Sequence, residues 1–267
     1  MRTFICVTCG AQYPESREPP ACCAICEDER QFVGLDGQQW TTLEDMAPTY
    51  SNHFEKVEPG LIMIGTRPAF AIGQNAFLLR EAKVLWDCLA FIDDATVADL
   101  AARGSVEAIG ISHPHFYTTC VEWSRALGGV PIYLHADDRE WLVRPDSSVS
   151  FWQGETLELA DGVTVVRGGG HFPGSAMLHW AAGAGGKGVV LGSDTISVAY
   201  DRKRATWMHS FANLIPLSPA KVWHTVEVLR PFPYDRLYSA WPQRVIHTDA
   251  QAIVRASAER YVEAMCD

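Results

Sequence analysis

Two histidines separated by one residue, His113 and His115, directly follow an apolar run at residues 106–111. Such a run predicts a buried strand, and a loop just past its end can turn both imidazoles toward one metal ion. Taken alone, a His-x-His pair is more often a pair of loop histidines without a ligand. The pair therefore needs support from other parts of the chain.

Three later stretches supply that support, because each places a His or an Asp where an apolar run gives way to a loop. These residues are His171, Asp194 and His247. Histidine and carboxylate at the ends of several strands are the ligands of a catalytic zinc or iron site. We expect His113, His115 and His171 to bind one ion and leave a fourth position open, where a bound water has its pKa lowered toward about 7.

The order of these four stretches, including Gly170-His171-Phe172-Pro173-Gly174-Ser175, resembles the metallo-β-lactamase superfamily over about residues 55–267. The resemblance implies an α/β fold, an αββα sandwich, with Asp194 as a shared or second-site ligand or the acceptor of the water proton. It also matches His247 to the late histidine that binds metal in the family. Taken alone, His247 could equally be a core residue.

The chain departs from the family at the end of the first motif. The usual pattern is His-x-His-x-Asp-His, and here the last two places hold Tyr117 and Thr118. A phenol with a pKa near 10 is a poor ligand, although Tyr117 could donate a hydrogen bond to a developing oxyanion or simply pack beneath the loop. We expect one tightly bound ion in this main site. Asp87, after another strand, corresponds to an acid that commonly braces the metal loop.

The first residues of the chain carry a second metal-binding pattern. Two Cys-x-x-Cys knuckles can hold one zinc tetrahedrally through Cys6, Cys9, Cys23 and Cys26. Cys22 is an alternative third ligand. The segment resembles a zinc ribbon or a rubredoxin, so we expect Zn²⁺ there, a ribbon-like segment at residues 1–36 and a metallo-β-lactamase-like domain at residues 37–267. The two metal centres should be separate, because one uses sulfur and the other nitrogen and oxygen.

The composition limits the partners. The 267 residues carry 22 Lys and Arg against 32 Asp and Glu, a formal charge of −10, which argues against nucleic acid as the main partner. No run approaches the roughly 18 apolar residues of a membrane span, and the amino terminus has no signal-like segment. We expect a cytoplasmic protein that acts on a small-molecule substrate without binding a membrane. The oligomeric state stays open.

The apolar patterns predict the elements that must position these residues. Predicted strands lie at residues 61–66, 69–72, 75–79, 83–87, 106–111, 131–134, 156–159, 163–167, 176–181 and 189–192. Predicted helices lie at residues 94–103, 118–127, 137–142, 219–229 and 249–264. Residues 34–58 read as an irregular connector, and the glycine-rich residues 183–188 as a hairpin turn.

Residues 199–217 form a connection long enough to be a binding loop or lid, with Trp207 and His209 among its aromatic side chains. Three functions fit these observations. The first is a hydrolase that uses a metal-activated water on an ester, thioester, lactone or phosphoester, with Zn²⁺ most consistent and Fe or Mn compatible. The second is a mononuclear iron oxygenase of the persulfide dioxygenase type. The third is a non-catalytic metal-binding module.

Overall fold

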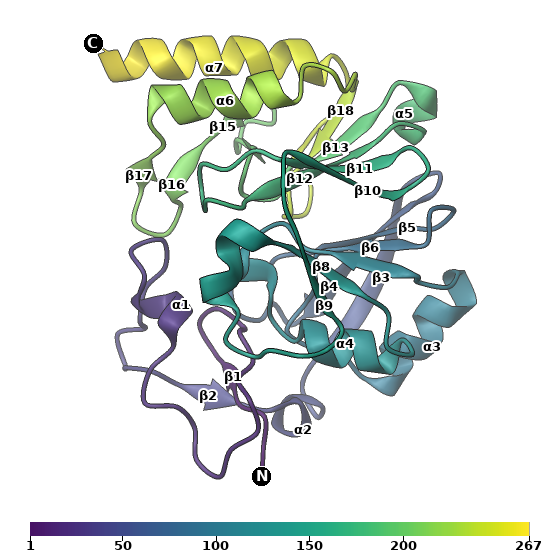
Figure 1. Cartoon of the computed structure of the whole chain (residues 1–267), viewed down its shortest axis with the longest axis vertical. Helices are drawn as coiled ribbons and strands as arrows, with labels where there is room; N and C mark the ends of the chain where they lie inside the picture. Colours follow the sequence, from purple (N-terminus) through teal and green to yellow (C-terminus); the bar gives the residue numbers. More distant parts are fainter. Residues whose placement is uncertain (267) are drawn as a thin grey trace.

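Two β-sheets lie face to face, with helices on the outer face of each (Figure 1). The computed structural model describes residues 1–266. The first sheet has the strand order β3 (Ser51–Glu58), β4 (Leu61–Arg67), β5 (Ala76–Leu79), β6 (Val84–Trp86), β7 (Ala108–Gly110), β8 (Ile132–His135) and β9 (Val149–Trp152). The second sheet has the order β10 (Thr156–Ala160), β11 (Val163–Arg167), β12 (Ala176–Trp180), β13 (Val189–Leu191), β18 (Arg236–Tyr238) and β19 (Val245–Ile246).

Two helices pack on each sheet. Helices α3 (Asp94–Arg103) and α4 (Cys120–Ala126) cover the first sheet, and α6 (Pro219–Val228) and α7 (Ala250–Cys266) cover the second. The short helices are α1 (Ala24–Glu27), α2 (Leu43–Met46), α5 (Gly183–Gly186), η1 (Pro114–Phe116) and η2 (Ala136–Trp141). Three two-stranded sheets pair β1 (Ile5–Cys6) with β2 (Trp40–Thr41), β14 (Ser197–Val198) with β15 (Ala205–Thr206), and β16 (Met208–Ser210) with β17 (Ile215–Pro216). The predicted αββα sandwich is confirmed.

Alternation along the strands explains the layers. In β4, Leu61 and Met63 pack between the two sheets, whereas Ile62 and Ile64 pack toward the helices of the first sheet. The same alternation occurs in β13, where Val190 faces α6 and α7 while Val189 and Leu191 pack between the sheets. The central strands of each sheet are therefore buried on both faces, which requires the apolar runs that mark these strands in the sequence.

The topology brings the loops with the candidate ligands to one edge of the sandwich. Strands β6 and β7 run parallel, so the loops that follow them leave on the same side. The backbone N–H of Ala176, at the start of β12, donates to the carbonyl of Ser112 at 2.9 Å, which joins the two sheets at this edge. The loops that carry His113 and His171 are therefore neighbours.

Most predicted elements are confirmed, and the structure also contains strands that the sequence did not predict. Helix α3 has the predicted bounds, because Asp93 caps its first turn and Gly104 ends it. Residues 69–72, predicted as a strand, form a turn instead. Residues 51–58 lie in the predicted connector but form β3, an edge strand whose mostly exposed side chains give little apolar pattern. Strand β9, which carries only a short apolar run, and the three-residue strand β18 were also not predicted.

The glycine-rich residues 183–188 connect β12 to the antiparallel β13, so the predicted hairpin turn is confirmed. No helix within residues 1–266 is both long and apolar enough to cross a membrane.

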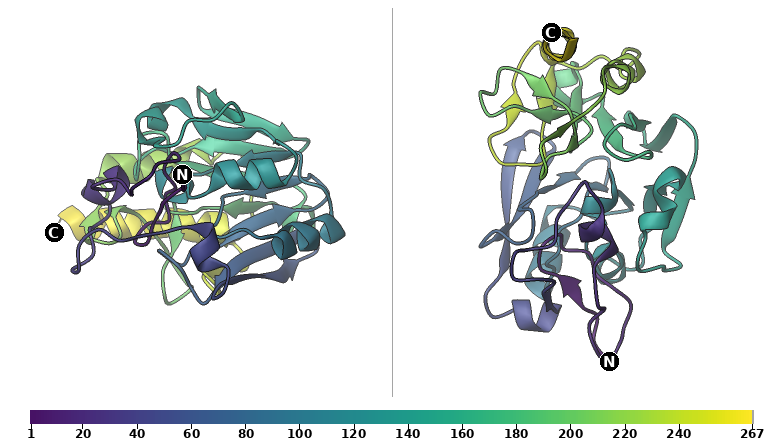
Figure 2. Two further views of the ribbon diagram at one scale, coloured as in Figure 1. Left: turned by 90° about the horizontal axis from the view of Figure 1, so that it is seen from below. Right: turned by 90° about the vertical axis from the view of Figure 1, so that its left-hand side faces the viewer.

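The N-terminal segment packs along one side of the sandwich (Figure 2). Strand β1 pairs with β2, which lies beyond the predicted boundary after residue 36. Ile5 also packs with Ala90 and Phe91 of the main body. The division into residues 1–36 and 37–267 stays a prediction, and Asp267 lies outside the described residues.

Candidate metal centre

Four buried side chains meet at the edge where the sheets join: His113, His115, His171 and Asp194. Oδ2 of Asp194 lies 3.3 Å from Nε2 of His113, 3.7 Å from Nε2 of His171 and 3.9 Å from Nδ1 of His115. The last two nitrogens lie 3.3 Å apart. Ligand atoms around a tetrahedral zinc with bonds of about 2.1 Å lie about 3.4 Å from one another. These four separations, 3.3–3.9 Å, are close to that spacing.

The polar atoms of the cluster fit a cation. Nε2 of His113 and Oδ1 of Asp194 are buried without a hydrogen-bond partner among the described residues. Leaving such groups unsatisfied costs about 1–3 kcal/mol each, a cost that a metal ion or its bound water would remove. Three imidazoles and one carboxylate are also ligands that zinc and iron accept.

The protonation states favour metal binding. Burial lowers the pKa of His113 to about 4 and the pKa of His171 well below its ordinary value, so both rings are neutral near pH 7. Burial by itself would raise the pKa of Asp194, but the adjacent imidazoles of His113 and His115 lower it well below its ordinary value. The cluster therefore presents nitrogen lone pairs and one negative charge.

Hydrogen bonds behind the ligands fix the ring orientations. Nδ1 of His171 lies 3.1 Å from the carbonyl oxygen of Met208, to which it donates, and this leaves the lone pair of Nε2 facing the cluster. Nδ1 of His113 lies 2.9 Å from the hydroxyl of Ser112. Such partners orient a histidine toward its metal and raise its basicity.

Asp87 joins two of the ligand loops. Its fully buried carboxylate accepts the backbone N–H of Ser112 at 2.8 Å and the hydroxyl of Ser193 at 2.7 Å. Ser112 precedes His113 and Ser193 precedes Asp194. The bracing role that the family resemblance implies for Asp87 therefore has a direct structural basis.

Glycines shape the turn around His171. Gly169 and Gly170 have φ values of 59° and 85°, a region that favours glycine. A side chain at Gly174 would place its Cβ 2.8 Å from Cγ of Asp138, whose carboxylate accepts the N–H of Gly174 at 2.7 Å. The turn therefore requires glycine on both sides of His171.

The cluster opens onto a cavity of about 810 Å³. His115, His171 and Asp194 line its metal side. The rest of the lining comes from the N-terminal segment, the loop between β14 and β17, and the loop before β19, and includes Arg30, Phe32, Tyr200, Phe211, Trp241 and Arg244. Aromatic surface with a few charged groups is typical of a small-molecule site, and such sites measure about 300–1,000 Å³.

Two predicted site residues lie elsewhere. The side chain of Tyr117 packs in the core, and its hydroxyl donates to the carbonyl of Asp138 at 3.3 Å. It therefore packs beneath the loop and does not face the cavity. His247 is exposed and lies outside the four-residue cluster, beside a different cavity that it lines with His53. Its strand, β19, is the edge of the second sheet. Of the two roles left open for Tyr117, the structure shows the packing one, so its place as a catalytic residue is corrected, as is that of His247 at the metal.

The connection at residues 199–217 is only partly a lid. Tyr200, Phe211 and Leu214 line the cavity, as expected of a binding loop. Trp207 does not, because it is fully buried in the core of the second sheet, with its ring 5.9 Å from that of Tyr261. The expectation that Trp207 contacts substrate is therefore corrected.

The sequence patterns did not predict the contribution of the N-terminal segment, where Arg30, Gln31 and Phe32 line the same cavity. The contact between Arg30 and His171 spans 141 residues, and no motif in the sequence marks it.

The second cluster joins Cys6, Cys9, Cys23 and Cys26, all buried. The sulfurs of Cys6 and Cys26 lie 3.5 Å apart, and those of Cys9 and Cys23 lie 3.6 Å apart. Tetrahedral zinc with Zn–S bonds of about 2.3 Å separates its sulfurs by about 3.8 Å. Cys22 is exposed and outside the cluster, so the third ligand is Cys23. The chain thus has two separate metal-binding sites, consistent with an N-terminal zinc ribbon and a His₃Asp site.

Comparisons with known proteins agree with this architecture. No family model matches the chain. VMB-1 is 12% identical with a TM-score of 0.59, over 80% of this chain and 98% of that one. The metallo-β-lactamase FIM-1 from Pseudomonas aeruginosa, in a mono-zinc form, is 13% identical with a TM-score of 0.57, over 79% and 96%. The flavodiiron core of Flv1 from Synechocystis is 13% identical with a TM-score of 0.56, over 81% and 62%.

The sandwich and the position of its buried His₃Asp cluster define a protein of the metallo-β-lactamase fold. The uncharacterized protein YmaE of Bacillus subtilis (strain 168) is 45% identical over 269 residues, which cover 99% of this chain and 97% of YmaE. The chain belongs to the same family as YmaE.

Proposed function

We propose that this protein is a metal-dependent hydrolase that acts on a small molecule bound in the 810 Å³ cavity. The observation that carries the proposal is the buried His₃Asp cluster at one wall of that cavity. A divalent ion bound there would lower the pKa of a bound water toward about 7 and polarise a substrate oxygen. Zinc is the ion most consistent with three imidazoles and one carboxylate, and iron and manganese are compatible.

The protein's own groups have distinct roles in this proposal. His113, His115 and His171 would hold the ion through ring nitrogens, and Asp194 would supply negative charge. Oδ1 of Asp194, which has no other hydrogen-bond partner among the described residues, can accept a proton from the attacking water. The bond that breaks is the ester, thioester, lactone or phosphoester bond of the substrate.

The site should hold one ion. Within residues 1–266, histidine, cysteine and acidic side chains gather into metal-ligand clusters at two places, the Cys₄ site and the His₃Asp site. Tyr117 turns away from the cavity and His247 lies outside it, so neither offers a ligand to a second ion beside Asp194.

The test compares hydrolysis of a panel of esters, thioesters, lactones and phosphoesters by the wild type and by His171→Ala. His224, exposed on α6, gives the matched control His224→Ala. We expect the His171 variant to lose one metal equivalent and its activity, whereas the control keeps both. A wild type that is fully loaded with metal yet hydrolyses no member of the panel would contradict the proposal. Purification with iron, together with oxygen consumption on a persulfide, would instead support the oxygenase.

A further inference from the structure

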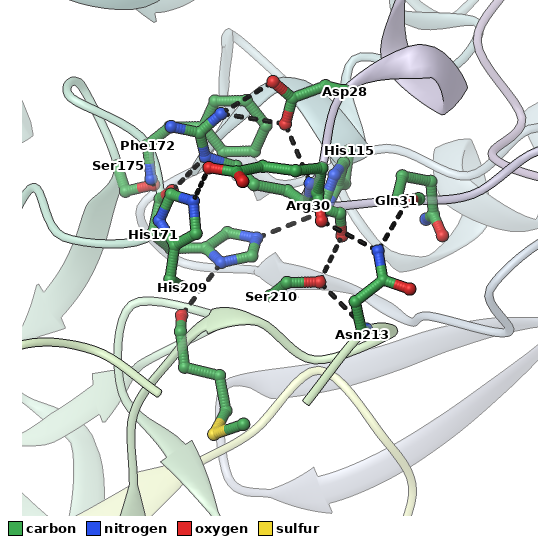
Figure 3. Close-up of polar contacts among 12 residues, drawn as sticks. Asp28, Arg30, Gln31, His115, His171, Phe172, Ser175, His209, Ser210 and Asn213 are labelled. Atoms are coloured by element: carbon green, nitrogen blue, oxygen red, sulfur yellow. Dashed lines mark hydrogen bonds and ion pairs between the residues drawn. The ribbon is translucent and has the colours of Figure 1, made fainter. Parts of the chain in front are cut away.

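The residues just after the last cysteine of the Cys₄ site reach the His₃Asp site. Arg30, four positions after Cys26, donates from Nε to the carbonyl oxygen of His171 at 2.6 Å (Figure 3). Its guanidinium lies 4.5 Å from the centre of the Phe172 ring. Asp28 holds the same guanidinium with contacts of 2.8 and 2.9 Å to its two carboxylate oxygens. Arg30 thus fixes the backbone of a metal ligand.

The opposite side of this segment is tied to the β16–β17 hairpin. The amide of Asn213 donates to the carbonyls of Glu29 and Gln31, at 2.8 and 3.0 Å, and the hydroxyl of Ser210 donates to the carbonyl of Arg30 at 3.2 Å. Strand β16 also contains Met208, which accepts from Nδ1 of His171. One hairpin therefore positions both the ring of His171 and the segment that holds its backbone.

The N-terminal segment also contacts the loop of the other two histidines. The backbone N–H of Gln12 donates to the carbonyl of Thr118 at 3.1 Å. Ile25, between two of the cysteines, lies against the same small void as Pro114, which separates His113 from His115. Both histidine loops are therefore packed against the segment that the four cysteines order.

We propose that the Cys₄ segment is a working part of the main site: Arg30 positions His171 for its metal, and Gln31 and Phe32 form a wall that selects substrate. Phe32 and Leu214 both line the cavity with 49% and 77% of their surfaces exposed. Exposed apolar groups at a cavity indicate a ligand that covers them. The substrate accordingly carries an apolar group that covers this wall. This substrate selection rests on the proposed hydrolase function, whereas the positioning of His171 does not.

The positioning role is tested by Arg30→Met, which keeps length but removes the donors, beside Arg30→Lys and the exposed control Arg17→Met. Co²⁺ loading separates the two sites, because four thiolates give a charge-transfer band and the His₃Asp site gives d–d bands. Chelator competition should show about a tenfold weaker His₃Asp site in Arg30→Met, the range for groups that orient a ligand. Arg30→Lys should recover part of the loss, and Arg17→Met should match the wild type, with the Cys₄ band unchanged in all three.

A second variant guards against misfolding of Arg30→Met. Asn213→Asp, at an exposed position, replaces the amide donor by a carboxylate and should weaken the His₃Asp site in the same direction. Affinities within about twofold of the wild type in both variants would overturn the positioning role, since ligand-orienting groups cost more than that.

The wall is tested by Phe32→Ser. We expect KM to rise about tenfold for esters with long acyl chains, because the variant exposes the apolar group of the substrate to water, while KM for acetyl esters and the metal affinity stay constant. Equal changes for short and long chains would overturn the selection role. If the wild type hydrolyses no ester, the proposed function fails, and the Co²⁺ measurement still decides the positioning role.

Discussion

At the scale of single residues, burial determines the chemistry of the main site. Desolvation keeps His113 and His171 neutral, and contact with His113 and His115 keeps Asp194 ionised. A site with these charge states binds a cation without first releasing protons from His113 or His171 near pH 7. The same burial makes the supporting groups important, because a ligand loop that shifts leaves polar atoms unpaired.

Asp87 allows a direct test of that support. Asp87→Ala would remove both acceptors that hold Ser112 and Ser193, and we expect metal affinity at the His₃Asp site to fall about 10–100-fold. Asp87→Asn keeps one acceptor for the N–H of Ser112 and should lose less. Chelator competition measures both. Unchanged affinity in Asp87→Ala would show that the loops hold their positions without this carboxylate.

The sequence predicted the residues of the main cluster better than it predicted their surroundings. His113, His115, His171 and Asp194 each follow a strand or a glycine turn whose pattern is local, so their meeting could be expected. Tyr117 was a candidate only because it occupies the Asp position of the His-x-His-x-Asp-His pattern. Its side-chain direction depends on the turn after η1 and on the carbonyl of Asp138, which no local pattern encodes.

At the scale of elements, the connection at residues 199–217 divides into a buried part and a cavity-lining part. Trp207→Ala should destabilise the protein by about 3–5 kcal/mol, because the ring is fully buried against Tyr261, and should leave the metal content of the folded protein unchanged. Phe211→Ala, at the cavity, should instead alter KM with little change in stability. Thermal unfolding and steady-state kinetics on both variants separate the two roles. A Trp207 variant as stable as the wild type would contradict this division.

Elements were predictable where their own residues determine them. Helix α3 carries its capping Asp93 and terminal Gly104, and β12 and β13 are mostly apolar strands buried on both faces. Strand β3 was missed because an edge strand depends on its partner β4 for order, and its own side chains are largely exposed. The pairing with β4, which the sequence of β3 alone does not display, determines that β3 is a strand.

At the scale of the whole molecule, two metal sites with separate ligands are joined by one segment. Cys23→Ser with Cys26→Ser should remove one metal equivalent, lower the stability of the protein and weaken the His₃Asp site without emptying it, because residues 28–32 lose their anchor. Cys22→Ser is the matched control and should change none of these properties, since Cys22 is exposed and outside the cluster. A double variant with an unaltered His₃Asp affinity would show that the hairpin contacts alone hold the segment.

The central claim is that the His₃Asp cluster is a one-ion hydrolytic centre, and a reconstitution titration tests it most directly. Protein with its Cys₄ site loaded and its main site stripped would receive Zn²⁺ in steps, with hydrolysis of the best ester, thioester, lactone or phosphoester of the panel followed at each step. The rate should rise in proportion to added metal and reach its plateau at about one equivalent per chain, as expected for one ion bound by three histidines and an aspartate. A plateau at about two equivalents, or no hydrolysis at any loading, would contradict the account.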